Sequence, residues 1–309
     1  MVNYLQLKDI SAYRSEIMGW AIVWIMMLHF GFYVLKPLGF VAQYGYAGVD
    51  IFMFMSGFGL FFSLEKALPL RDFYTRRLKR IFPAYYAVGF FASFLLFHDN
   101  LLQYLFRFTT IGFWTGGLYA EWYVPSIVLL YVASPLLKRL GIYGQVGLAI
   151  LLLVVACILV EREDLIDGEH YFMLLRVPAF LWGMVCASWL KEGRSMAWFY
   201  VVLIACLPFF VWLYPYHHQV YMYKYLSVSF LLPVFLCLFM MISRGLKCMN
   251  PVMRYIGRAS LEIYLIQFLF FTMLLNDMIM RSDLATIGMI IISSLLGILL
   301  HQLLERKLL

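Results

Sequence analysis

Charged residues are scarce in this chain, and no polar block separates one part of it from another. Of its 309 residues only 13% are charged, whereas 64% are hydrophobic, and the mean hydropathy is +0.85. A water-soluble domain could not bury so much apolar surface. The composition therefore excludes ordinary soluble proteins and predicts one integral membrane domain over residues 1–309, with no appended soluble domain.

Cysteine is also scarce, and its five copies suggest neither a disulfide framework nor a metal site. They lie in or beside apolar runs, and none pairs at the spacing of a metal-ligand motif. We therefore expect no metal. The first apolar run is too long for the core of a signal peptide and lacks a small-residue cleavage pattern. We expect it to remain as a membrane helix.

Apolar runs long enough to cross a bilayer recur along the whole chain, at roughly 20 residues a crossing. They cover residues 17–35, 46–64, 81–97, 122–137, 143–160, 171–190, 196–214, 226–243, 259–279 and 284–304. An N-terminus in the cytoplasm places 18 of the 24 Lys and Arg residues inside and 6 outside or near the outer boundary. The sequence thus predicts an all-α bundle of about ten transmembrane helices with both termini cytoplasmic. This topology, rather than nucleic-acid binding, explains the net charge of +7.

A histidine near the outer end of the first run is the leading candidate for chemistry. Ionisable residues at membrane depth are costly and usually face the bundle interior or a wet cavity. A neutral imidazole can take a proton from a hydroxyl group at physiological pH, so His29 suits a general base. A packing histidine is the alternative. Arg14 lies 15 residues earlier, within about 60° of the same helical face, and is expected to line the same path.

The second run contains a buried acid and a hydroxyl group. An unpaired carboxylate at Asp50 would be costly in the membrane, so it needs His29 or a cation as its partner. Two interpretations of Asp50 stay open, namely orienting His29 and capping its own helix. Ser56 follows six residues later, beside Gly57, whose small size lets helices approach closely.

The densest basic cluster of the chain lies between residues 71 and 83. A positive-inside anchor would by itself account for it. The functional alternative is a docking site for an anionic cofactor, because guanidinium groups bind phosphates in a bidentate manner. Arg77 and Arg80 are three residues apart on one helical face, and Arg76 adjoins them.

Six short segments form an ordered pattern along nearly the whole chain. They are GVDIFMFMSGF at 48–58, RLKRIFP at 77–83, EWYVP at 121–125, RVPAFLWG at 176–183, YIGRASLEIYL at 255–265 and LLER at 303–306. In this order they resemble the signature segments of the acyltransferase 3 family of bacterial membrane acyltransferases. Two positions depart from that pattern: Met18 replaces an arginine, and Gln267 replaces a histidine. Glutamine can form a hydrogen bond but cannot carry a proton at neutral pH.

The resemblance implies transfer of an acyl group, usually acetyl from acetyl-coenzyme A, to a hydroxyl of an extracytoplasmic glycan at a bacterial inner membrane. His29 would be the essential group, as base or as transient acyl carrier, and we favour the base; Asp50 would assist it. The expected partners are the lipid bilayer, the glycan and acyl-CoA, without nucleic acid; homo-oligomerisation stays open. The arginines expected at the donor are Arg14, Arg76, Arg77 and Arg80. The residues expected at the acceptor are Ser56, Glu121, Trp122, Tyr123 and Arg176.

An exporter of a glycan or small solute is the main competing class. Ten helices with buried polar residues and broken helices would suit a transporter equally well. Against it, the two halves of the chain show no inverted repeat. Replacing His29 separates the classes, because an acyltransferase loses glycan acylation while export continues.

Overall fold

The computed structural model describes residues 4–66, 68–117, 121–162, 165–218 and 221–308, and over these residues every regular element is a helix. The elements are α1 (Leu7–Ala12), α2 (Arg14–Phe30), α3 (Lys36–Ala42), α4 (Ala47–Glu65), α5 (Leu70–Ala92), η1 (Ser93–Phe97), α6 (Leu101–Arg107), α7 (Ile111–Thr115), α8 (Tyr123–Arg139), α9 (Gly141–Leu159), α10 (Gly168–Lys191), α11 (Ala197–Leu213), η2 (Tyr214–His218), α12 (Tyr221–Ser229), α13 (Leu232–Gly245), α14 (Asn250–Arg258), α15 (Ser260–Leu275) and α16 (Asp283–Leu308). The predicted all-α class is confirmed.

Six of the described segments are long and apolar enough to cross a membrane: α4, α5 with η1, α9, α10, α11 and α16. The pairs α12/α13 and α14/α15 meet the same measure jointly, but they bend by 62° and 76° at their breaks. Helices α2 and α8 have 17 residues each and extend only about 26 Å. The chain is therefore a multi-pass membrane protein, and its described residues provide six such helices, or up to eight spans if each bent pair counts as one. The total of ten and the cytoplasmic termini stay predictions.

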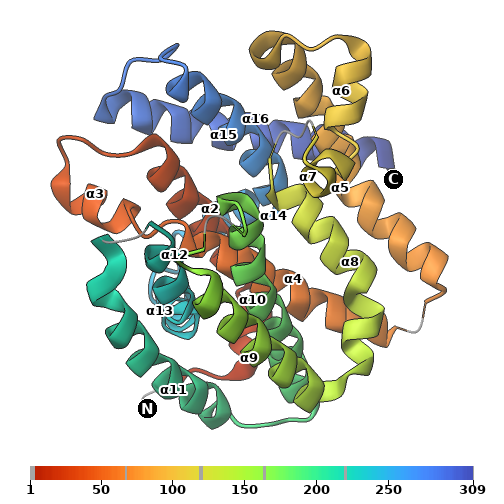
Figure 1. The fold of residues 1–309 in the computed structure, drawn as a ribbon, viewed down its shortest axis with the longest axis vertical. Helices are drawn as coiled ribbons and strands as arrows, with labels where there is room; N and C mark the ends of the chain where they lie inside the picture. The colour runs from red at the N-terminus through yellow and green to blue at the C-terminus, as the bar shows by residue number, and fades with distance from the viewer. Residues whose placement is uncertain (1–3, 67, 118–120, 163–164, 219–220, 309) are drawn as a thin grey trace.

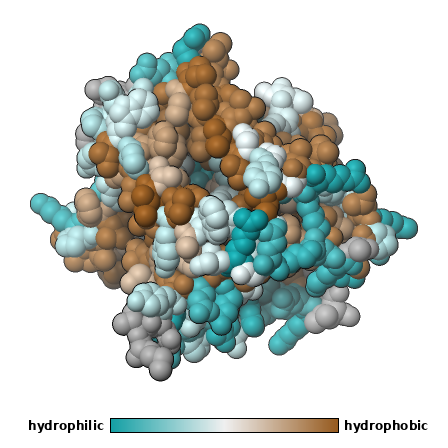
Figure 2. Space-filling view, turned by 90° about the horizontal axis from the view of Figure 1, so that it is seen from below, coloured by the Kyte–Doolittle hydropathy of each residue, from teal (hydrophilic) through white to brown (hydrophobic). Residues whose placement is uncertain are grey.

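Helices α9 and α11 lie in the lower half of the view in Figure 1, and both expose apolar side chains on the outside of the bundle. Only 11% of each of these spans is buried inside the protein, and side chains such as Ile158 and Val211 are 67% exposed. Figure 2 shows hydrophobic residues over much of one face, with hydrophilic residues gathered toward its lower part. Exposed apolar helices of this length are suited to contact lipid.

Two helix crossings in the interior depend on glycine. At the α4–α10 crossing, an added Cβ at Gly57 would collide with the carbonyl oxygen of Phe180, and one at Gly183 with that of Phe54. At the α2–α14 crossing, Gly257 lies in the same way against the carbonyl of Ser15. Small residues allow such backbone approach in membrane proteins. These crossings fix α2, α4 and α14, three of the helices that enclose the candidate site.

Replacing Gly183 by valine is expected to prevent the α4–α10 crossing and to remove most of the folded protein. The new side chain would meet backbone atoms, which cannot move aside as a flexible side chain can. The yield of monodisperse protein in detergent and its thermal midpoint measure the effect. Gly147→Val on α9 is the matched control, since no atom lies within 4 Å of a Cβ there. A Gly183 variant as stable as this control would contradict the prediction.

Candidate functional site

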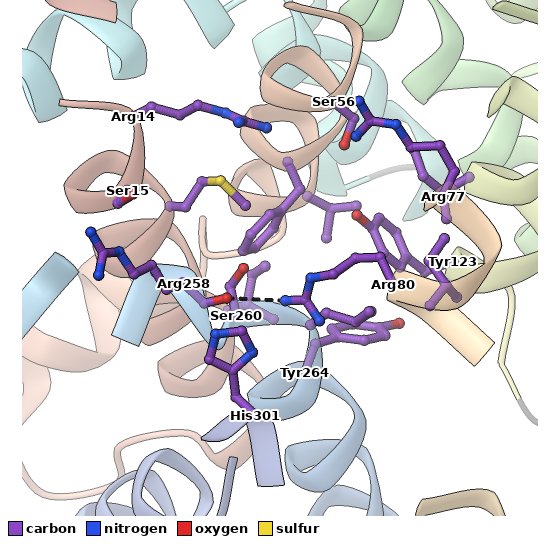
Figure 3. A pocket seen from close by; sticks show the side chains of 18 of the residues that line it. Arg14, Ser15, Ser56, Arg77, Arg80, Tyr123, Arg258, Ser260, Tyr264 and His301 are labelled. Carbon is purple, nitrogen blue, oxygen red and sulfur yellow. Dashed lines mark hydrogen bonds between the residues drawn. The ribbon is translucent and has the colours of Figure 1, made fainter. Parts of the chain in front are cut away.

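A cavity of about 480 Å³ lies among α2, α4, α5, α8, the break between α14 and α15, and the end of α16 (Figure 3). Arg14, Met18 and Ile25 line it from α2, so it follows that helix along most of its length. Its remaining polar lining is Ser15, Ser56, Arg77, Arg80, Tyr123, Tyr131, Arg258, Ser260, Tyr264, His301 and Glu305. The predicted residues Arg14, Ser56, Arg77, Arg80 and Tyr123, far apart in sequence, are thus brought to one space.

Four guanidinium groups from three helices border this cavity. Arg14 belongs to α2, and Arg77 and Arg80 belong to α5. Arg258 is the last residue of α14. Figure 3 shows Arg14 and Arg77 on opposite sides of it, with Arg258 near the break. The excess of positive charge favours an anionic ligand. Arg76 is exposed and does not line the cavity.

Arg258 was missed by the sequence reasoning. Its only signal was its place inside the fifth family-like segment, where it reads as one more basic residue at the end of a helix. The 76° break after α14 turns that helix end toward the cavity. The direction of a break of this kind is set by packing rather than by local sequence.

Arg80 has partners within the protein. Its guanidinium donates two hydrogen bonds to the carboxylate of Glu262, a fully buried side chain of α15, and one to the carbonyl oxygen of Arg258 at 3.0 Å. His301 Nδ1 lies 3.2 Å from the same carboxylate. Arg80 therefore ties α5 to both sides of the α14/α15 break. This shared role leaves Arg14, Arg77 and Arg258 as the better candidates for an incoming anion.

His29 lies one helical turn beyond the inner end of the cavity. Ile25 and Tyr264 line that end, and His29 and Gln267 follow them by four and three residues on α2 and α15. One turn corresponds to about 5 Å. The imidazole is half-buried; its Nδ1 is 2.8 Å from Gln267 Oε1, and its ring stacks on Phe271 at 4.6 Å. His29 therefore faces a neighbouring helix inside the bundle.

The segment that follows His29 is fastened to the start of α16. The Asp283 carboxylate accepts hydrogen bonds from the backbone N–H groups of Tyr33 and Leu35 at 2.6 and 2.7 Å, and from that of Val34. Thr286 Oγ1 donates to the carbonyl oxygen of Gly31 at 2.7 Å. These hydrogen bonds fix the C-terminal end of α2, and with it the position of His29 along the helix axis.

Asp50 and Arg176 form a pair in the core. Both residues are 1% exposed, and Arg176 Nε lies 3.3 Å from Asp50 Oδ1. Arg176 Nη1 also lies 3.4 Å from Ser229 Oγ. The contact confirms the expectation that a cation on a neighbouring helix is the partner of Asp50. It shows the carboxylate neither orienting His29 nor capping α4. A catalytic role for Asp50 stays a prediction, as does acceptor binding by Arg176.

Glu121 caps helix α8. Its carboxylate accepts hydrogen bonds from the backbone N–H groups of Tyr123 and Val124 at 2.6 and 2.8 Å, and from the hydroxyl of Tyr264 at 3.1 Å. These donors belong to the protein, so Glu121 has a structural role independent of any substrate. Trp122 packs on Phe172 at 6.1 Å and does not line the cavity. Substrate contacts of Glu121 and Trp122 stay predictions.

Comparison with known proteins gives a consistent outcome. The sequence model of the acyltransferase 3 family, described as an acyltransferase domain, matches residues 19–305. The "Putative acetyltransferase ORF330" of Acidianus two-tailed virus is 23% identical over 289 residues, a stretch covering 83% of this chain and 82% of that protein. No solved structure matches the chain.

Proposed function

Given that the chain belongs to the acyltransferase 3 family and is a membrane acyltransferase, we propose that it transfers acetyl or another short acyl group from cytoplasmic acyl-CoA to a hydroxyl of an extracytoplasmic glycan. We place it in the bacterial inner membrane. The donor is proposed to enter at the arginines, and the acceptor to approach from the side of His29. The observation that carries the proposal is the cavity that extends from Arg14, Arg77 and Arg258 to within one helical turn of His29.

The charge of the donor explains the arginines. Acyl-CoA carries several phosphate charges, and Arg groups bind phosphates through paired N–H donors. Because the anionic end stays at the arginine-lined end, the uncharged thioester arm is free to pass inward beside Met18 and Ile25, which line the cavity along α2. The family arginine that Met18 replaces is compensated by Arg14, one turn of helix earlier on the same wall.

The transfer itself requires one base. The acceptor oxygen bonds to the acyl carbon while His29 takes the hydroxyl proton; the carbon–sulfur bond then breaks, and the imidazolium returns that proton to the leaving thiolate. The products are an ester and a free thiol, and no further reactant is needed. Removing the scissile thioester from bulk water into the bundle protects it from hydrolysis.

Replacing Arg77 by alanine is expected to raise the KM for acetyl-CoA about tenfold and to leave kcat nearly unchanged. Loss of one charged contact to a phosphate weakens binding of the ground state and transition state alike. The assay follows labelled acetyl groups from acetyl-CoA into the envelope glycan of a strain that lacks the protein. Arg76→Ala is the matched control, because Arg76 is the adjacent arginine and lies outside the cavity. Equal KM values in the two variants would count against donor entry here.

The breaks in α12/α13 and α14/α15 are also a feature of transporters, so an exporter is the second candidate. It predicts that acylation of the glycan continues in a strain carrying a His29 variant, while export of the glycan stops. The acyltransferase predicts the reverse. Mass spectrometry of cell-surface glycan separates the two, since an acetyl group changes its mass and loss of export changes its amount.

A further inference from the structure

Gln267 lies against the histidine that we propose as the base. It is a fully buried residue of α15, and its Oε1 is 2.8 Å from His29 Nδ1. A carbonyl oxygen only accepts hydrogen bonds, so Nδ1 must carry the proton in this contact. The other ring nitrogen, Nε2, is then left with its lone pair. The contact thus selects the tautomer that a base needs if Nε2 faces the acceptor.

The same helix also fixes the orientation of the ring. Phe271 follows Gln267 by four residues, so both side chains lie on one face of α15. The Phe271 ring stacks on the imidazole at 4.6 Å with an angle of 23° between the planes. A hydrogen bond in the ring plane and a stack on its face together remove the freedom of the imidazole to flip or tilt.

The NH2 group of the Gln267 amide does not contribute to the stability of the fold. Its Nε2 is buried and has no hydrogen-bond partner among the described residues. A buried donor without an acceptor is destabilising, and a leucine of similar size would avoid it. A side chain kept at such a cost is more readily explained by function than by packing.

We propose that Gln267 is a positioning residue that holds His29 neutral and in the Nδ1–H tautomer, so that Nε2 serves as the base. This inference rests on the proposed function of His29. A glutamine is suited to the task because it orients the ring without adding a negative charge that would favour the imidazolium. No charged side chain of the described residues forms an ion pair with His29.

Two variants of Gln267 test the proposal. In Gln267→Leu the accepting oxygen is lost, and kcat with labelled acetyl-CoA is expected to fall about tenfold or more. The KM for acetyl-CoA should stay the same, and the thermal midpoint should stay the same or rise. In Gln267→Glu the oxygen is kept and a charge is added. Activity should then be retained at high pH, and the acidic limb of the pH–rate profile should move upward by about one to three pH units.

The outcomes are distinguishable from failure of the proposed function. If His29→Ala retains full transfer, the proposed function itself is wrong. If His29→Ala is inactive while Gln267→Leu keeps the wild-type kcat and Gln267→Glu the wild-type pH profile, only the inference is wrong. A Gln267→Leu protein that loses activity together with its thermal stability would assign Gln267 to packing and would also overturn the inference.

Discussion

Replacing His29 by alanine is expected to lower kcat for acyl transfer by about 10²- to 10⁴-fold, the usual contribution of a general base. The protein should remain folded, because the change removes one hydrogen bond and one ring stack at a half-buried position near the end of α2. The KM for acetyl-CoA should change little, since the arginines lie at the other end of the cavity. Turnover of labelled acetyl-CoA in proteoliposomes, with glycan from a strain lacking the protein, measures both constants.

The control is a variant of a different histidine, one that lies at the surface. His98 is exposed and has a positive φ of 53°, so His98→Asn removes an imidazole while keeping a residue that tolerates that backbone conformation. It should transfer acetyl at the wild-type rate. Full activity of His29→Ala beside this control would contradict a catalytic His29.

The same variant, incubated with labelled acetyl-CoA in the absence of glycan, shows whether His29 acts as a base or as an acyl carrier. If His29 carried the acyl group, incubating the protein with labelled acetyl-CoA and no glycan would attach label to the protein, and His29→Ala would prevent it. For the base we expect no label on either protein. The hydrogen bond of Nδ1 to Gln267 is compatible with both, because Nε2 is the reactive nitrogen in each case.

Replacing Asp50 by asparagine is expected to destabilise the protein by about 3–5 kcal/mol, because it leaves the Arg176 guanidinium buried without a counter-charge. Both side chains are at most 2% exposed, so water cannot substitute for the carboxylate. The measurement is the thermal midpoint in detergent. Asp277→Asn is the control: its ion pair with Arg281 is exposed, and its loss should cost less than about 1 kcal/mol.

A double variant shows whether this pair serves the reaction as well. Asp50→Leu with Arg176→Leu removes both charges and should recover most of the stability lost in Asp50→Asn. If Asp50 also orients or assists His29, the double variant will be stable but inactive. If the pair is structural, the stable double variant will transfer acetyl normally. A single Asp50→Asn variant as stable as wild type would contradict the expected cost.

Much of the architecture could be predicted from the chain alone. Apolar runs of about 20 residues dictate helices, because a backbone in lipid must satisfy its own hydrogen bonds, and each predicted run overlaps a helix or helix pair. The number of membrane spans was harder to predict than the positions of the helices. Helices α2 and α8 are 17 residues long. The run 226–243 bends between α12 and α13, and the run 259–279 begins at the break before α15. A helix break of one or two residues hardly changes the mean hydropathy of a run, so the hydropathy of the sequence does not reveal the break.

The candidate site was predictable by residue type and only partly by position. His29 stood out because an imidazole is costly at membrane depth. Arg14 stood out because it shares a helical face with His29, and Arg77 because it belongs to the densest basic cluster of the chain. Their arrangement was hidden in the sequence: Arg258 enters the cavity through the α14/α15 break, and Arg80 is engaged by Glu262.

The sequence by itself determined the membrane class, the helical fold and the family. A backbone in lipid must form its hydrogen bonds internally, which long apolar runs do as helices. The family follows from the six segments and their order along the chain. The tertiary structure alone decided which side chains meet. It paired Asp50 with Arg176, joined Glu121 to the hydroxyl of Tyr264 and placed Gln267 against His29. Partners 126 to 238 residues apart are selected by helix crossings and breaks, and these depend on packing between segments that no local pattern encodes.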